Sequence, residues 1–371
     1  MAGSLLSRVG HLLRTRIGWH RLGLILSVLI LGVACYVLWK MLHGINLAEV
    51  GEAFTSKPVH ALLLAALFVV LGYFTLTFYD WFGLHTIGKG HIPYRVAALA
   101  GFSSYSIGHN VGATVFTGGT VRYRLYSGWG LTVLDVARLA FVAGLTFWLG
   151  NITVLGIGIF IHPEAASAVD QLPPLANRII AVTALCGLVA YVMWIGRKPR
   201  IYGRGSWYVT LPARGPTLLQ IVIGVVDLTC CALAMFVLMP AHPDADFITV
   251  AVVFITATLL GFASHTPGGI GVFDAAMLVA FTSGKWGVPV FDKEELLASL
   301  LLFRVFYYLM PFAVALVLLA SREVWLGGVS GLRDALLFRT KEAKASSEAG
   351  PACRDPGTAC AGKPDGTAPG A

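Results

Sequence analysis

The sequence predicts an all-α polytopic membrane protein with about six full transmembrane helices and two opposed re-entrant hairpins in an inverted repeat. Composition sets the class, since 57% of the 371 residues are hydrophobic, 12% are charged and the mean hydropathy is +0.76. Glycine pairs and polar groups interrupt the apolar sequence around 106–124 and 264–271. Backbone that leaves helical geometry at bilayer depth must be buried in protein or line a cavity, so function is expected at these two breaks.

Six apolar stretches approach or reach the roughly 17 to 25 residues that a membrane-spanning helix needs. They cover 22–39, 59–83, 131–161, 179–195, 217–239 and 296–320. The first lacks a small-residue cleavage site, so it is interpreted as a retained span rather than a signal peptide.

Charge asymmetry predicts the orientation of these spans. Lys and Arg cluster before the first span, between 197 and 214, and after the last span, which places both termini in the cytoplasm. The segments with few basic residues are expected on the other side: 43–58, 162–178, 240–247 and 283–295. The positive-inside rule thus explains the net charge of +8, and no nucleic-acid partner is expected.

With this orientation, each break is predicted to be the bend of a re-entrant hairpin. Residues 96–115 lie between two cytoplasmic segments, and 248–282 lie between two outside segments, so the hairpins enter from opposite faces. The spacing between Asp80 and the first glycine pair is close to the spacing between Asp227 and the second glycine pair. Inverted repeats with broken helices that meet near the midplane are typical of secondary transporters.

Three domains follow from this organisation. Residues 1–21 form a basic cytoplasmic N-terminus, and 22–325 form the transmembrane domain, with half repeats at about 59–196 and 217–320. Residues 326–371 are rich in small residues, proline and charge, which predicts a disordered cytoplasmic tail.

Polar groups near the breaks suggest how a ligand is bound. Helices beginning at about Gly119 and Gly269 would present free N–H groups to an anion, and Arg122 and Arg124 would add charge-assisted hydrogen bonds to a phosphate. The alternative for both arginines is a role as interfacial anchors. His265 in the second break and His109 in the first either contact a headgroup or cap backbone groups that the break leaves free.

Ionisable residues inside apolar segments are functional by default. The alternative is an internal ion pair, such as Asp227 or Asp274 with Arg304, and Arg138 is a further candidate for such a pair. The candidate substrate-binding residues are Asp80, His109, Asn110, Gly118, Gly119, Arg122, Arg124, Asp227, His265, Gly268, Gly269, Asp274 and Arg304.

Signatures of catalysis are missing from the sequence. It contains no GxSxG, HExxH or Walker glycine loop, and the cysteines show no metal-ligand spacing. We therefore expect no catalytic residue, no metal and no cofactor, and transport that either follows a gradient or equilibrates its substrate.

Two motifs resemble a known family. They are the run from Ser104 to Leu149, with His109-Asn110, Thr117-Gly118-Gly119 and Val121-Arg122-Tyr123-Arg124, and the run Ser264-His265-Thr266-Pro267-Gly268-Gly269-Ile270-Gly271 followed by Arg304, Tyr307, Tyr308 and Pro311. Both are similar to the membrane region of lysylphosphatidylglycerol synthases of the MprF type, and to the stand-alone YbhN-like and HpnL-like proteins.

The resemblance implies a phospholipid flippase of the bacterial inner membrane. In that family the membrane region moves aminoacylated phosphatidylglycerol between leaflets, which raises resistance to cationic antimicrobial peptides. The soluble aminoacyl transferase domain has no counterpart here, so synthase activity is not expected, and a separate synthase is a candidate partner. The alternatives are a non-transporting lipid-binding scaffold, a transporter of hopanoids or other lipids, and an intramembrane lipid-modifying enzyme. A homo-oligomer is left open.

Overall fold

A computed structural model describes residues 32–40, 47–204 and 207–324, and this part of the chain is mainly helical. Five of its helices are long and apolar enough to cross a membrane. They are α4 (Val59–Thr86), α7 (Val133–Ile161), α9 (Pro174–Ile195), α10 (Arg214–Leu238) and the helix Lys293–Val324, which begins as α13 (Lys293–Phe303). The predicted all-α polytopic membrane fold is confirmed.

Only part of the first predicted span is described. Residues 32–40 are helical, whereas 22–31 lie outside the described residues. The predicted N-terminal segment 1–21 and the tail 326–371 also lie outside them.

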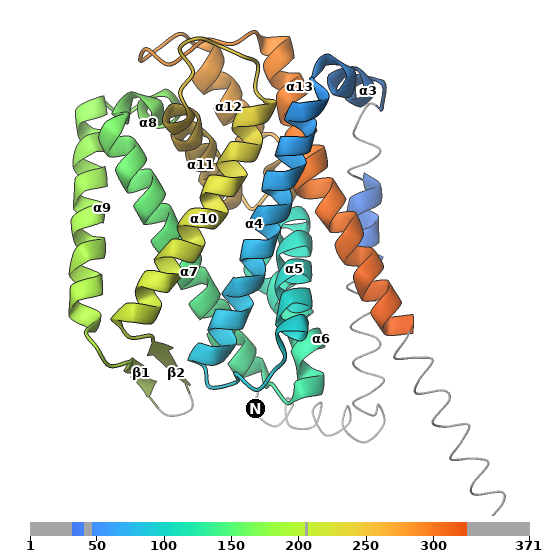
Figure 1. Ribbon diagram of the computed structural model, residues 1–371, viewed down its shortest axis with the longest axis vertical. Coiled ribbons are helices and arrows are strands. Elements are labelled where there is room, and N and C mark those ends of the chain that lie inside the picture. Colours follow the sequence, from blue (N-terminus) through green and yellow to red (C-terminus); the bar gives the residue numbers. More distant parts are fainter. Residues whose placement is uncertain (1–31, 41–46, 205–206, 325–371) are drawn as a thin grey trace, which may run out of the picture. The chain divides into compact units, whose positions relative to one another are not determined.

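Two pairs of shorter helices form the hairpins. The first consists of α5 (Tyr94–Val111) and α6 (Thr114–Tyr126), and the second of α11 (Phe247–Ala263) and α12 (Val272–Thr282), with the 3-10 turn η2 (Pro267–Gly269) at its bend. The first hairpin extends from the lower end of the bundle in Figure 1 and the second from the upper end. The opposed arrangement expected from the charge pattern is therefore present in the structure.

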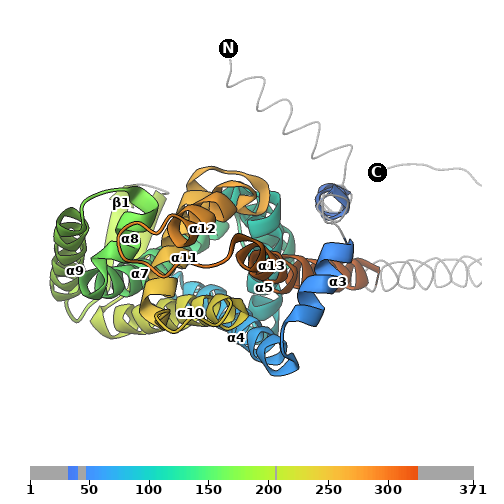
Figure 2. The ribbon, with the colours of Figure 1, turned by 90° about the horizontal axis from the view of Figure 1, so that it is seen from above.

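Element order repeats along the chain. A long helix, a broken hairpin and a second long helix appear as α4, α5–α6 and α7, and again as α10, α11–α12 and α13. Between these two sets lie α8 (Pro163–Asp170) and α9, and α9 stands at the edge of the bundle in Figure 2.

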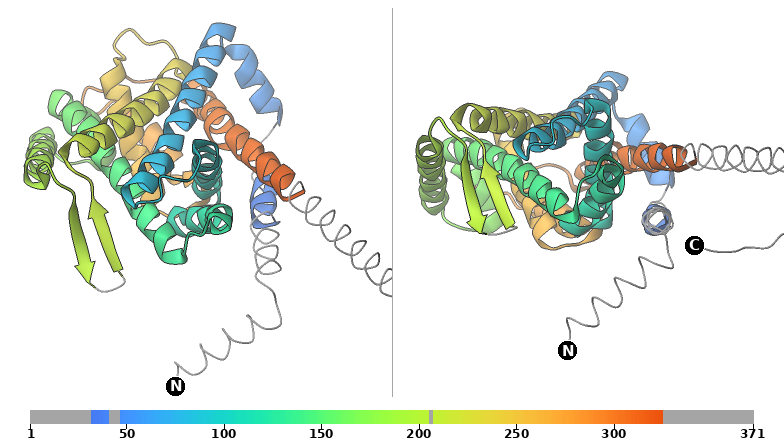
Figure 3. Two further views of the ribbon diagram at one scale, coloured as in Figure 1. Left: turned by 60° about the horizontal axis from the view of Figure 1, so that its bottom comes forward. Right: turned by 90° about the horizontal axis from the view of Figure 1, so that it is seen from below.

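Some short elements were not expected. These include α3 (Leu47–Ser56), α8 and the 3-10 turn η1 (Ser127–Trp129). The basic segment 197–214, expected as a loop, contains the antiparallel strands β1 (Arg200–Arg204) and β2 (Trp207–Leu211), seen in Figure 3. Aromatic and β-branched residues favour this pairing, and Arg138 stacks on Tyr208, with its guanidinium carbon 3.8 Å from the ring centre.

Glycines let the long helices approach one another. A Cβ added at Gly150 of α7 would lie 2.6 Å from the carbonyl carbon of Gly224 in α10, so neither position has room for a side chain. At Gly72, where α4 meets α10, an added Cβ would lie 3.6 Å from Cys230 Cβ. Small residues at such crossings are typical of membrane helix packing.

The last long helix contains a π-helical segment, η3 (Arg304–Leu309). A π segment displaces the regular hydrogen-bond register and often marks a functional site. Here Tyr73 donates its hydroxyl hydrogen to the carbonyl oxygen of Tyr307 at 2.9 Å, and Asn110 donates from Nδ2 to that of Tyr308 at 3.2 Å. The segment is thereby bound to both α4 and α5.

Candidate functional site

The first break lies at Gly112 and Ala113. Gly112 has φ 84° and Ala113 has φ 45°, and α6 begins at Thr114. The prediction that a helix begins at Gly119 is therefore wrong, because the turn forms five residues earlier, where Thr117 Oγ1 donates to the carbonyl oxygen of Gly112 at 3.0 Å. A non-glycine residue in the left-handed region is uncommon and often marks a functional position.

The glycine pair expected at the break lies inside α6, and only its first member has a packing role. A Cβ at Gly118 would lie 3.2 Å from the carbonyl oxygen of Ser104, so Gly118 lets α6 approach α5. Gly119 faces open space. Neither residue is at a helix start, so the expected N–H groups for an anion belong to Thr114 and Val115 instead.

The second break matches the sequence expectation more closely. Gly268, Gly269 and Gly271 all have positive φ, and α12 begins at Val272, close to the predicted start. Gly269 also packs against Gly261, whose Cα lies 3.5 Å from a Cβ built on Gly269. A side chain at Gly269 would be strained chiefly by the φ of 63° at this position.

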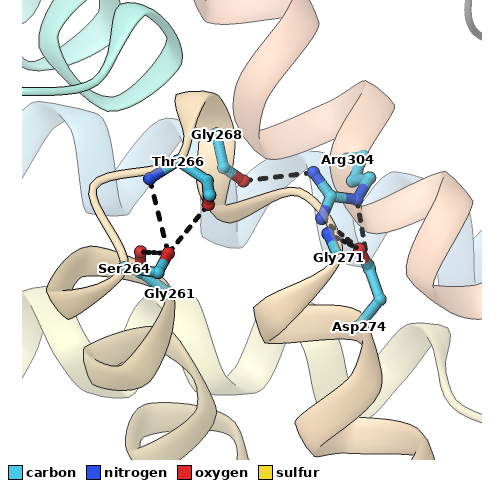
Figure 4. A network of polar contacts seen from close by, with 7 residues as sticks. All are labelled: Gly261, Ser264, Thr266, Gly268, Gly271, Asp274 and Arg304. Atoms are coloured by element: carbon cyan, nitrogen blue, oxygen red, sulfur yellow. Dashed lines mark hydrogen bonds and ion pairs between the residues drawn. The ribbon is translucent and has the colours of Figure 1, made fainter.

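Arg304 and Asp274 fix this second break (Figure 4). Arg304 Nε donates to Asp274 Oδ1 at 3.0 Å, Nη2 contacts Oδ2, and Nη1 donates to the carbonyl oxygen of Gly268 at 3.1 Å. Asp274 also accepts from the N–H of Gly271 at 3.0 Å. Of the two pairs considered for Arg304, the structure contains the one with Asp274.

A second acid–arginine pair anchors the first hairpin to α4. Asp80 is fully buried, and Arg122 of α6 donates to it from Nε at 3.0 and 3.1 Å and from Nη2 at 2.7 Å. Tyr126 adds a hydroxyl hydrogen bond at 2.9 Å. Arg122 is 5% exposed and lies over the ring of Tyr105, so it is held inside the protein rather than at a lipid interface.

The two breaks touch. A Cβ at Gly112 would lie 3.2 Å from the carbonyl oxygen of His265 and 3.6 Å from the nitrogen of Pro267. Glycine is required at this position both by its positive φ and by this close approach. Beside the contact is a cavity of about 450 Å³, lined by residues of both hairpins and of α7.

Polar groups on the wall of this cavity are few. The polar residues that line it include Arg122, His109, His265 and Thr114. Aromatic residues line it as well, among them Tyr105, Phe147, Trp148 and Phe262. An apolar cavity with a few converging polar groups is the usual form of a ligand site. The aromatic lining was not predicted, because its members come from several separate helices and each suits an ordinary membrane helix.

His109 and His265 differ in their surroundings. His109 Nδ1 is buried without a hydrogen-bond partner in the described part of the chain, and its ring packs on Tyr105 and Phe262. His265 is exposed, has φ 55° and contacts the carbonyl oxygen of Ala263 through Nδ1 at 2.9 Å. The backbone-capping role considered for these histidines therefore fits His265, whereas His109 keeps Nδ1 without a partner among the described residues.

Other candidates lie outside the cavity wall. Asn110 is buried and donates to the carbonyl oxygens of Ser106 and Tyr308. Arg138 contacts Asp135 at 3.5 Å near the start of α7, and Arg124 is half-buried on α6. Asp227 is 4% exposed in α10.

A second cavity, of about 630 Å³, opens where the end of α3 meets the end of α10 and the start of α13. Lys57 and Glu295 line it. Burial lowers the pKa of Lys57, and this exceeds the opposing effect of Glu295. The sequence did not single out this cavity.

Metal ligands do not cluster within the described residues, where no group of three His, Cys, Asp or Glu side chains is placed to hold an ion. The cavity between the breaks offers hydrogen bonding and charge at a mostly apolar wall.

Comparison with known proteins places this architecture among bacterial membrane proteins. No protein-family model matches the chain. It is 29% identical over 256 residues to the uncharacterized protein slr0712 of Synechocystis, covering 69% of this chain and 77% of that protein. It is 28% identical over 263 residues to the inner membrane protein YbhN of Escherichia coli, covering 69% and 78%.

A shorter match is with phosphatidylglycerol lysyltransferase of Staphylococcus aureus. The identity is 40% over 82 residues, which are 22% of this chain and 9% of that protein. The motif resemblance found in the sequence is thereby confirmed: the chain is a homologue of the inner membrane protein YbhN and of a segment of phosphatidylglycerol lysyltransferase.

Proposed function

We propose that this chain is a phospholipid translocase, which moves an anionic or aminoacylated lipid such as lysylphosphatidylglycerol between the leaflets of the bacterial inner membrane. The observation that carries the proposal is the cavity between two hairpins that enter from opposite ends of the bundle and touch at Gly112 and His265. Such a site is reached from either end by moving one hairpin relative to the other, as alternating access requires.

Headgroup chemistry fits the wall of this cavity. The start of α6 offers the N–H groups of Thr114 and Val115, and His109 and Arg122 line the same cavity. Helix starts and guanidinium groups both favour phosphate. Acyl chains would remain in the bilayer while the headgroup passes between the breaks.

Homology supports a lipid-related role. One relative is named for its action on phosphatidylglycerol and another as an inner membrane protein. The 82 matched residues are a small part of the lysyltransferase, and the sequence of this chain offers no catalytic motif. We therefore propose movement of the lipid without chemical change, with both termini in the cytoplasm and a separate synthase as a possible partner.

The direct test is lipid exchange in liposomes that contain the purified full chain. Fluorescent phosphatidylglycerol, lysylphosphatidylglycerol and phosphatidylcholine are compared by bleaching the outer leaflet with an impermeant reductant. Translocation predicts faster loss of fluorescence than in empty liposomes, and mass spectrometry should find the lipid unchanged. A changed mass would indicate an enzyme, and binding without exchange would indicate a scaffold.

One glycine allows the cavity to be blocked without disturbing the fold. Gly144 lies on the cavity wall, and a Cβ added there meets nothing within 4 Å. Gly144→Leu should fill the path and slow exchange about tenfold if it raises the barrier by about 1.4 kcal/mol. Gly187→Leu is the matched control, since Gly187 is also helical and open but lies on α9, away from the cavity. Equal rates for the two variants would refute the assignment of this cavity as the path.

A further inference from the structure

Three aspartates of the helix bundle were candidates for substrate contact, and one of them stands apart. Asp80 is bound by Arg122 and Asp274 by Arg304. Asp227, in the middle of α10, forms no salt bridge with any described residue and is 4% exposed. A carboxylate without a cation is costly at bilayer depth, which favours the neutral acid at this position.

Neutral donors, and no cation, contact Asp227 among the described residues. Tyr79 of α4 donates its hydroxyl hydrogen to Oδ2 at 3.0 Å. Oδ1 faces Cys231 Sγ at 3.9 Å, and that thiol lies 3.2 Å from the hydroxyl oxygen of Tyr307. Neutral hydroxyl and thiol groups thus surround both carboxyl oxygens.

Among the described residues, no cation faces Asp227 from a neighbouring element. The titratable groups that face Asp227 are Tyr73 and Tyr79 of α4, Tyr105 of α5, Cys230 and Cys231 of α10, and Tyr307 of η3. α11 carries no charged residue, and in α7 the charged pair Asp135 and Arg138 lies near the helix start. Arg122 and Arg304 are each already bound to another aspartate.

Asp227 also lies at the seam between the two repeated sets of helices. Gly72 of α4 faces it, and a Cβ added there would be in van der Waals contact with Oδ1 at 3.9 Å and with Cys231 Sγ at 3.7 Å. A charged carboxylate needs water or a cation beside it, and Asp227, at 4% exposed and with no ion pair among the described residues, is shielded from both. Ionisation of Asp227 therefore requires α4 and α10 to separate, which is a movement of one set of helices relative to the other.

Aromatic rings connect this position to the cavity between the breaks. The Tyr79 ring packs on Tyr105 with centres 5.7 Å apart, and Tyr105 packs on His109, also at 5.7 Å. Tyr105 and His109 line the cavity. A change at the seam is thus transmitted through packed side chains to the proposed headgroup site.

We infer that Asp227 is a proton-binding site, through which lipid movement is coupled to a proton gradient; the coupling rests on the proposed translocase function. In the packed state the carboxyl group holds its proton. When α4 and α10 part and water enters, the O–H bond breaks, the proton passes to water, and the carboxylate remains. Repacking requires a proton from the water on whichever side is then open, and no oxidant or reductant takes part.

The proton site is tested without reference to transport. Infrared spectra of the full chain in lipid, recorded over a pH series, should contain the carbonyl stretch of a buried carboxylic acid that is lost in Asp227→Asn. Asn keeps the acceptor for Tyr79 and cannot ionise. The matched control is Asp244→Asn, since Asp244 is exposed in the loop before α11 and its replacement should leave the band in place. A wild-type spectrum without a band that depends on Asp227 would overturn the assignment.

Coupling is tested in the exchange assay. An imposed pH gradient should accelerate lipid exchange by wild type and by Asp244→Asn, and Asp227→Asn should lose this response. Wild-type exchange that does not respond to either direction of gradient would overturn the coupling while leaving the translocase intact. If no lipid exchanges at all, the translocase fails, whereas the infrared band still decides the proton site. Loss of exchange confined to lysylated lipid, with no acid band, would instead identify Asp227 as a contact for the lysyl ammonium and overturn the inference.

Discussion

Replacing Arg122 by alanine tests the ion pair that holds the first hairpin. Arg122 is a single residue of α6, but it supplies three hydrogen bonds to the fully buried Asp80. The variant would leave that carboxylate with the hydroxyl of Tyr126 as its remaining donor among the described residues. Removal of one partner of a buried pair is therefore expected to cost far more than the pair contributes when both partners are present.

The magnitude follows from burial. Breaking a buried pair typically costs about 3 to 5 kcal/mol, because an uncompensated charge remains inside the protein. Arg122→Ala should lie in this range, and Asp80→Asn should also be strongly destabilising because it strands the guanidinium. The double variant Asp80→Asn with Arg122→Ala removes both charges, so its loss should be smaller than the sum of the two single losses by about 1 to 3 kcal/mol.

Reversible unfolding in mixed detergent micelles, followed by tryptophan fluorescence, measures these differences. Asp244→Asn is the control, since this exposed aspartate lies outside the network. Additive single losses, with no coupling between the two positions, would refute the pair. The result also governs how transport data are interpreted, because slow exchange by Arg122→Ala reports on anion binding only if the variant remains folded.

Three further outcomes are expected. Gly150→Ala should destabilise the protein by about 1 to 3 kcal/mol, because its Cβ meets α10 backbone, whereas Gly144→Ala in the same helix should cost little; equal thermal stabilities would contradict the close crossing. Burial alone would raise the pKa of Asp246, the N-cap of α11, but hydrogen bonds from Thr249 hold this pKa below its usual range. The ionised cap therefore stabilises the fold at neutral pH, and this stabilisation is lost as pH falls through the lowered pKa. Asp246→Ala should cost about 1 kcal/mol in a pH series of unfolding curves, with the difference vanishing in acid. In a cysteine-free background, a cysteine at position 127 should resist an impermeant label on intact cells and one at 285 should react, since both positions are exposed and lie in connections at opposite ends of the bundle; the reverse pattern would overturn the predicted orientation.

Most helices could be predicted because their signal is local. Apolar length and flanking charge located the five long described spans to within a few residues at most ends, for instance 59–83 against Val59–Thr86. The distribution of basic and acidic residues also predicted which connections lie at the same end of the bundle. The first break was misplaced because the glycine pair Gly118–Gly119 suggested a turn, whereas the left-handed conformation falls on Gly112 and Ala113.

The strands β1 and β2 were missed for a related reason. Arginines in the segment 197–214 indicated a cytoplasmic loop, and the alternating aromatic and β-branched residues among them are too few to indicate a hairpin by themselves. The π segment was missed as well, because its residues have no local pattern that distinguishes them from an ordinary apolar helix.

The sequence by itself determined the membrane environment and the five long apolar helices that the structure describes, since these depend on local apolar length and charge. Only the tertiary structure decided which charges meet. Asp80 pairs with a residue 42 positions away and Asp274 with one 30 positions away, while Asp227 has no such partner within the described residues. Such choices depend on how helices cross and which faces they share, and the energy of a buried charge is set by neighbours that the chain brings together only on folding.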